Sequence, residues 1–219
     1  MIKRKELDEG LLLLKEKLVE MGVRVEKGLT DAMEALQAVD AERARHIIAE
    51  DMKLNQLEES INDLGARMIA TQQPVAKDLR RILTAFKMAA DLERMGDLSV
   101  DIAKVVVRLE GQQLVKPLID LPRMAEITAQ MIHESIQSYV DENVNLACKM
   151  AQDDDKVDAL FSEVIRDLFA LMIENPMTVS QTSLISFVGR YIERIADHAT
   201  NIGESVVYLV TGKRPDLNM

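Results

Sequence analysis

Apolar residues recur along almost the whole chain with the spacing of one face of an amphipathic helix. The pattern predicts two groups of three helices, at about residues 6–38, 41–71 and 75–110 and at about 118–141, 143–173 and 178–211. The alternation of apolar and polar residues that is typical of strands does not run long enough to indicate a sheet. The pattern therefore predicts an all-α protein.

Residues that end helices stand between the predicted elements. Pro74 separates the second helix from the third, and Asn175-Pro176 stands at the equivalent place in the second group. The segment from Gly111 to Pro117 separates the two groups. We therefore expect one three-helix domain over residues 1–112 and another over residues 113–219.

Two short segments indicate that the second group repeats the first. Residues 92–97 read LERMGD and residues 192–197 read IERIAD, an offset of 100 positions. Through the first two helices of each group the offset is 103, as between Met21 and Met124, and the difference of three residues falls in a hairpin loop. A length change in a loop is what a duplicated fold tolerates best. The sequence thus predicts two tandem three-helix bundles that are related by internal duplication.

Composition narrows the class of protein further. Aromatic residues make up 3% of the chain and Trp is absent, which favours close-packed aliphatic helices over a sheet. The net charge of −10 opposes contact with nucleic acid or anionic lipid. Cys148 is the only cysteine, so the chain has no internal disulfide, and no secretion signal or membrane span is evident. We expect a cytoplasmic protein.

Carboxylates of the first group lie level with one another across a hairpin. Helices joined by a short loop run antiparallel, so residues that are equally far from the turn lie opposite each other. Counting out from Pro74 places Asp51 level with Asp97, and Asn55 level with Glu93. The spacing of four residues within each helix puts both members of a pair on one face.

The second group has the same arrangement. Counting out from residues 175–176 places Asp154 level with Asp197, and Asp158 level with Glu193. Two level pairs of oxygen-bearing side chains, each present in both halves of a duplicated chain, point to a shared ligand-binding design. Such side chains repel one another unless a multivalent cation lies between them, and hard oxygen ligands suit Mg, Mn, Ca or ferric iron.

The candidate metal sites are two clusters, each extended by a further helical turn. The first cluster is Asp51, Asn55, Glu58, Glu93, Asp97 and Asp101, and the second cluster is Asp154, Asp158, Glu193, Asp197 and Asn201. His198 is a possible additional ligand because it follows Asp197. In each half these residues lie away from the apolar stripe of their helix, so we expect surface sites.

Two other interpretations remain open at this point. Arg94 and Arg194 lie inside the repeated segments and would neutralise the clusters as internal ion pairs in a purely structural scaffold. A carboxylate-bridged metalloenzyme of the ferritin-like type would point its ligands into the bundle core and use a Glu-x-x-His motif, which this sequence lacks. No phosphate-binding loop or nucleophile–base spacing is evident either, so we expect a protein that is not an enzyme.

The repeated Glu-Arg-x-x-Asp segments in a duplicated helical frame closely resemble the PhoU family, and the resemblance covers nearly the whole chain. The segment from Gln72 to Arg80 is similar to the first hairpin turn of that family. By this resemblance Glu93, Asp97, Glu193 and Asp197 match its most characteristic metal-binding positions. The two sites need not be equal, because Asn55 and Asn201 replace carboxylates present in the other half.

The resemblance also implies a function. It implies a cytoplasmic, usually homodimeric regulator that represses phosphate uptake and the phosphate-starvation regulon. Such a protein would act without catalysis, by coupling the ATPase subunit of the phosphate ABC transporter to a membrane sensor histidine kinase in signal transduction. The metal ions that the resemblance implies are iron, zinc, magnesium or manganese.

Overall fold

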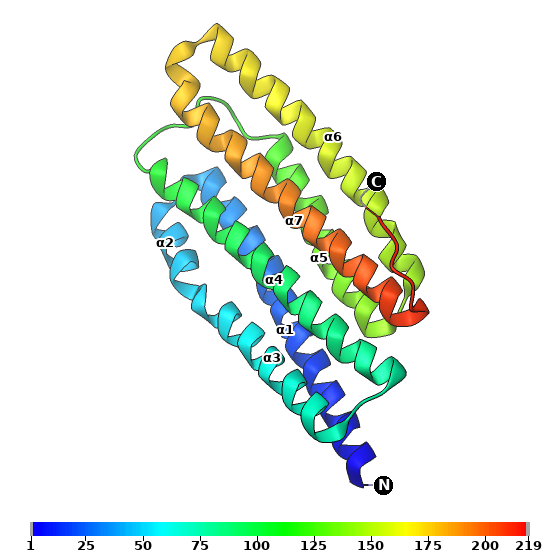
Figure 1. Ribbon diagram of the computed structural model, residues 1–219. Coiled ribbons are helices and arrows are strands. Elements are labelled where there is room, and N and C mark those ends of the chain that lie inside the picture. The colour runs from blue at the N-terminus through cyan, green and yellow to red at the C-terminus, as the bar shows by residue number, and fades with distance from the viewer. Residues whose placement is uncertain (1, 218–219) are drawn as a thin grey trace.

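The computed structural model describes the backbone of residues 2–217 and the side chains of residues 4–217. Within this range the ordered elements are helical (Figure 1). They are α1 (Ile2–Ala38), α2 (Ala41–Glu50), α3 (Met52–Gln72), α4 (Ala76–Arg108), α5 (Asp120–Asp141), α6 (Val144–Glu174), the short 3₁₀ helix η1 (Pro176–Thr178) and α7 (Val179–Thr211).

The predicted helix over residues 41–71 is divided at Asp51, which is a correction to the expected element order. The backbone of Asp51 keeps helical angles, with φ −52° and ψ −42°. Its carbonyl oxygen accepts a hydrogen bond from the amide of Leu54 at 3.0 Å, three residues on rather than four. The interruption contains neither Pro nor Gly, so the apolar periodicity continues through it and predicts one helix.

Equivalent residues begin equivalent helices in the two halves. Asp40 Oδ1 accepts a hydrogen bond from the amide of Arg43 at 2.9 Å, at the start of α2. Asn143, which is 103 positions later, accepts one from the amide of Leu146 at 3.1 Å at the start of α6. Each side chain satisfies an amide that has no partner within its helix. The duplication therefore extends to the capping of these helices.

The helices form two bundles that pack side by side (Figure 1). The first bundle holds α1 to α4, and the second holds α5 to α7. Between them α4 packs against α7 and α1 against α5, and the members of each of these pairs run antiparallel (Figure 1). Because α4 is the duplicate of α7 and α1 that of α5, the interface between the bundles is made of equivalent helices.

The core consists of the aliphatic stripes that the sequence pattern predicted. Leu18 and Met21 on α1, Ile61 on α3, Met95 on α4 and Ile195 on α7 are fully buried. No described helix is long and apolar enough to cross a membrane. The predicted domain boundary lies in the segment over residues 109–119, which connects α4 to α5, and its place within that segment stays a prediction.

Candidate metal-binding clusters

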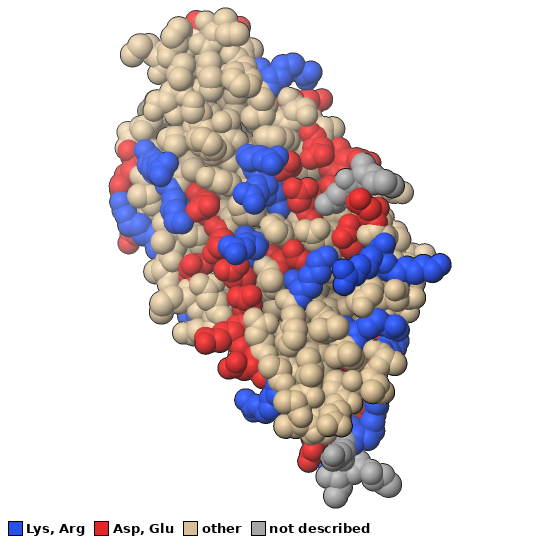
Figure 2. All heavy atoms as spheres, in the orientation of Figure 1, with Lys and Arg blue, Asp and Glu red and all other residues tan. Residues whose placement is uncertain are grey.

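The first cluster lies where the start of α3 packs against α4. A Cβ atom on Gly96 would lie 2.1 Å from Leu54 Cδ2, so the absence of a side chain at Gly96 permits this approach. Asp51 at the start of α3 and Asp97 on α4 flank the contact. Figure 2 shows Asp and Glu side chains gathered where α3 meets α4 and again where α6 meets α7.

Most carboxylates of the first cluster affect one another's ionisation. Burial raises the pKa of Asp51, and the negative charges of Asp97 and Asp101 raise it further. Burial likewise raises the pKa of Glu93, followed by the charge of Asp97 and, more weakly, those of Glu58 and Asp51. The clustered carboxylates are therefore harder to ionise together than apart.

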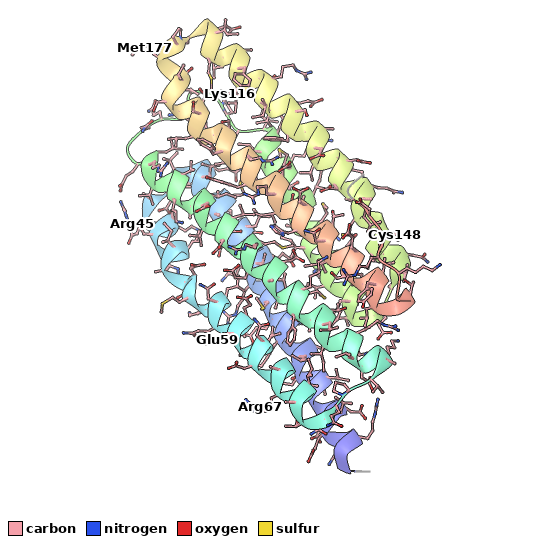
Figure 3. All side chains as sticks on the ribbon, viewed as in Figure 1. Arg45, Glu59, Arg67, Lys116, Cys148 and Met177 are labelled. Carbon is pink, nitrogen blue, oxygen red and sulfur yellow. The ribbon has the colours of Figure 1, made fainter. Side chains whose placement is uncertain are left out.

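Two residues of α3 at this cluster differ from the rest. Asn55 is exposed, and its side chain takes part in none of the hydrogen bonds among residues 4–217. Glu59 follows Glu58 in the sequence but points away from α4 into solvent (Figure 3). Glu59 is thus a carboxylate on the same helix that lies outside the cluster.

Two cations neutralise part of the first cluster. Arg94 Nη1 lies 3.4 Å from Asp97 Oδ2, and its Nε lies 3.6 Å from Glu93 Oε2. Lys104 Nζ lies 2.7 Å from Asp101 Oδ1. The side chain of Arg94 is 66% exposed, so solvent weakens its attraction to the cluster. The ion pairs expected for a scaffold without metal are therefore present in part here.

The second cluster is more deeply placed. Asp154 on α6 is 8% exposed, and burial raises its pKa to about 7, with further contributions from the charges of Asp197, Asp158 and Glu193. Burial and the charge of Asp197 raise the pKa of Glu193. Burial and the charge of Asp158 raise the pKa of Asp197. The level pairs that the sequence predicted therefore face each other across α6 and α7.

Arg190 pairs directly with Glu193, whereas the charge of Arg194 acts on it only more weakly and from a distance. Arg190 Nη1 donates a hydrogen bond to Glu193 Oε1, whereas Arg194 takes part in no ion pair among residues 4–217. Glu193 Oε2 is buried and has no hydrogen-bond partner among the described residues. The sequence reasoning missed Arg190, although its position three residues before Glu193 was a usable signal.

The prediction that both clusters face outward is wrong for two residues, because Asp154 and Glu193 are 8% and 9% exposed. Glu193 is buried because α7 is covered by α4, α5 and α6, and the period of a single helix does not indicate the cover that the other bundle adds. Asp154 lies on α6, where α6 packs against α7. In the first cluster the side chains of Asp97 and Asp101 remain 39% and 37% exposed. The first cluster is therefore open, whereas the second combines the buried Asp154 and Glu193 with the exposed Asp158.

A buried carboxylate of the first bundle contacts the edge of the second cluster. Asp91 on α4 is 8% exposed, and its Oδ1 lies 2.9 Å from His198 Nδ1 on α7. Asn201 Nδ2 donates a hydrogen bond to the same oxygen at 3.5 Å. Asp91 Oδ2 has no partner among the described residues. His198 and Asn201 therefore join the two bundles, and sequence reasoning missed Asp91 because it lies outside the level pairs.

The donor chemistry of both clusters fits a hard cation. Burial, followed by the repulsion among the carboxylates, raises the pKa values of Glu93, Asp154 and Glu193, and Glu193 Oε2 is a buried acceptor that lacks a donor. Among residues 4–217, however, no three His, Cys, Asp or Glu side chains already converge as a ligand set. The fold thus brings the donors near each other without holding them in coordination geometry.

The protein therefore belongs to the class of tandem helical-bundle proteins, and it has an acidic cluster at the same place in each bundle. The family model for the PhoU domain matches residues 18–106 and again residues 121–206. The chain belongs to the PhoU family.

Proteins that are similar to this chain match over nearly its full length. A phosphate-specific transport system accessory protein PhoU homolog of Clostridium acetobutylicum is 39% identical over 216 residues, which cover 98% of this chain and 99% of that protein. The PhoU accessory protein of Escherichia coli is 32% identical over 200 residues, covering 91% of this chain and 83% of that protein. The crystal structure of PhoU from Pseudomonas aeruginosa has a TM-score of 0.90 at 33% identity and covers 94% of this chain and 99% of that one.

Proposed function

We propose that this protein is a regulator of phosphate homeostasis that acts as a non-enzymatic adaptor in the cytoplasm. It would couple the ATPase subunit of the phosphate ABC transporter to a sensor histidine kinase and so repress phosphate uptake and the phosphate-starvation regulon. The observation that carries the proposal is the full-length similarity to accessory proteins of the phosphate-specific transport system. We also propose that the protein acts as a homodimer.

Metal ions are proposed as part of the same function. Asp51, Glu93 and Asp97, with Glu58 and Asp101, would hold a cation between α3 and α4. Asp154, Asp158, Glu193 and Asp197 would hold one between α6 and α7. A cation supplies positive charge that offsets the repulsion among these carboxylates, and side-chain rotation would complete its ligand set. Iron, zinc, magnesium and manganese are the proposed ions, and the oxygen donors favour the harder ones.

The first cluster is the better candidate for contact with a partner because its carboxylates are partly open. A cation held by Asp97 and Asp101 would still have coordination positions facing solvent, where a carboxylate of a partner protein would bind. The second cluster would stabilise the contact between α6 and α7, since Asp154 and Glu193 are buried. We therefore assign docking to the first cluster and stability to the second.

The test is affinity capture from phosphate-replete cells with three versions of the tagged protein: wild type, wild type stripped of metal, and the double variant E93A/D97A. Glu59→Ala is the matched control, because it removes a carboxylate of α3 that lies outside the cluster (Figure 3). We expect wild type and the control to retain the transporter ATPase subunit and the kinase, and the other two versions to lose them. Equal capture by all versions would refute the metal bridge, and capture of neither partner by wild type would refute the adaptor role.

The burial of Asp154 and Glu193 favours one alternative, a carboxylate-bridged metalloprotein of the ferritin-like type. That protein would bind two ferrous ions and change its optical absorption on exposure to oxygen. A purely structural scaffold is the third possibility, and it would carry no metal. Elemental analysis of protein purified without chelator separates the scaffold from the other two, and the optical experiment on iron-loaded protein separates those from each other.

A further inference from the structure

A cavity of about 190 Å³ lies between α4, α7 and the segment that follows α7. None of the residues of the two acidic clusters lines it. Thr84 and Lys87 line it from α4, Glu204 and Tyr208 from α7, and Arg214 from the final segment. A water molecule occupies about 30 Å³ of liquid, so the cavity has room for a small ligand and several waters.

The hydroxyl group of Thr84 has no partner in this cavity wall. Thr84 is 3% exposed, and its Oγ1 forms no hydrogen bond among the described residues. Ser205, which also lines the cavity, shows the usual arrangement, because its Oγ donates to the carbonyl of Asn201 at 2.9 Å. A buried hydroxyl without a partner is destabilising, so its presence at a cavity points to a ligand that accepts its hydrogen.

Two cations at the cavity have weak partners within the protein. Lys87 Nζ lies 3.8 Å from Glu204 Oε2, beyond hydrogen-bond distance. The guanidinium of Arg214 stacks on the ring of Tyr208, with 5.1 Å between Cζ and the ring centroid, and forms no ion pair among residues 4–217. Figure 2 shows Lys and Arg side chains gathered over this C-terminal end of α7. The cavity therefore offers two positive charges to a ligand.

The carboxylate of Glu204 limits which anions fit. Its Oε1 accepts a hydrogen bond from the amide of Leu217 at 3.1 Å, which fastens the final segment beside the cavity. An ionised carboxylate can only accept hydrogen bonds. It therefore tolerates a nearby anion only when that anion carries a proton and donates a hydrogen bond to it. At neutral pH hydrogen phosphate carries such a proton and sulfate does not.

The two polar residues that α4 contributes to the lining have apolar counterparts in the duplicate half. At the offset of 100 positions, Thr84 corresponds to Leu184 and Lys87 corresponds to Phe187. The bundle design therefore does not require a hydroxyl or an ammonium group at these helical positions. Their presence on α4 alone is specific to this cavity.

We propose that the cavity binds a small oxyanion that carries a proton, of the hydrogen phosphate class. Lys87 and Arg214 oppose its charge, Thr84 donates its hydroxyl hydrogen to an oxygen of the anion, and Glu204 accepts the proton of the anion. Inorganic phosphate and the phosphate group of a modified side chain share this chemistry. The second is largely without its proton at neutral pH, so Glu204 favours the free ion.

The test is isothermal titration of the full-length protein, stripped of metal, with inorganic phosphate, sulfate and O-phosphoserine at equal ionic strength. Metal-free protein excludes binding through the acidic clusters, so the result is independent of the proposed metal function. We expect saturable binding of inorganic phosphate. Sulfate and O-phosphoserine should bind at least about tenfold more weakly, because each lacks one charge-assisted hydrogen bond to Glu204. Absence of phosphate binding, or equal binding of sulfate or phosphoserine, would overturn the proposal.

Variants locate the site. Lys87→Gln and Thr84→Val should each weaken phosphate binding by about tenfold. The second variant removes an unsatisfied hydroxyl and leaves the fold at least as stable, so its effect cannot be assigned to misfolding. Glu204→Gln should abolish the preference for phosphate over sulfate. Arg45→Gln removes an exposed cation that pairs with Glu110 on the first bundle, and it should change nothing. Unchanged affinity in the Lys87 and Thr84 variants would place any binding elsewhere and overturn the assignment.

Discussion

His198 Nδ1 on α7 lies 2.9 Å from Asp91 Oδ1 on α4, and this contact joins the two bundles next to the second cluster. Both side chains are largely buried, with 19% and 11% of their surfaces exposed. The contact therefore links the position of α4 to that of the carboxylates on α7.

Removal of either partner should destabilise the protein. His198→Ala leaves the carboxylate of Asp91 buried with one oxygen already unpartnered, and we expect a loss of about 1–3 kcal/mol in the free energy of unfolding. The measurement is urea denaturation of the single variants and of D91A/H198A. We expect the double variant to lose less than the sum of the single losses, by roughly 0.5–3 kcal/mol. Asp63→Ala, at an exposed site on α3, is the control, and strict additivity would contradict a direct interaction.

Asp154 should make the metal-free protein less stable as the pH rises. Its pKa is about 7 in the folded protein and 3.8 ordinarily, so between these values the folded state binds more protons than the unfolded state. The free energy of unfolding then falls with increasing pH by up to about 1.4 kcal/mol per pH unit from this group. Denaturation at a series of pH values measures the slope. Asp154→Asn should flatten it and be more stable than wild type above neutral pH, and equal slopes would contradict the assignment.

Two glycine substitutions should have opposite effects. A Cβ atom at Gly203 would lie 2.8 Å from the carbonyl oxygen of Ala147, so Gly203→Ala must push α7 away from α6 and should cost about 1–3 kcal/mol. A Cβ atom at Gly28 meets nothing closer than Ser99 Cβ at 3.9 Å, so Gly28→Ala should stabilise α1 by up to about 1 kcal/mol. Thermal unfolding of both variants is the measurement. If Gly203→Ala raised the melting temperature, the close approach of the two helices would be refuted.

Arg94 and Arg190 should compete with metal ions for the carboxylates that they pair with. Arg190→Gln frees Glu193 Oε1, and Arg94→Gln frees the oxygens of Glu93 and Asp97. Each change should raise metal affinity severalfold at its own cluster, because the cation no longer has to displace an ion pair. Competition with a fluorescent chelator gives the affinities. Arg67→Gln, at an exposed site on α3, is the control, and a fall in affinity in either test variant would contradict this competition.

The level pairs of carboxylates were predictable because they depend on local geometry. A short loop at Pro74 or at residues 175–176 determines which residues of two antiparallel helices lie opposite each other, and the period of the helix determines the face. Asp51 and Asp97 come together for these reasons, as do Asp154 and Asp197. The duplication supplied an independent check, since the same arrangement occurs twice.

Two further features depend on how the bundles pack together, which helical period does not encode. Asp91 meets His198 only because α4 lies beside α7, and the same packing buries Glu193. The choice of Arg190 over Arg194 depends on side-chain rotamers within a single turn. The interruption at Asp51 has no Pro or Gly to signal it. For these features the sequence specifies the participants without specifying their contacts.

The packing of α4 on α7 and of α1 on α5 has an evolutionary consequence. Contact between equivalent helices in antiparallel orientation is the geometry that two identical half-length chains adopt around a twofold axis. A homodimeric three-helix ancestor, fused through the segment over residues 109–119, would yield this architecture without inventing a new interface. A fused chain, unlike a homodimer, can differ between its halves. At the offset of 100 positions the counterparts of Asp91 and His198 are Tyr191 and Leu98, so the carboxylate–imidazole contact occurs only once.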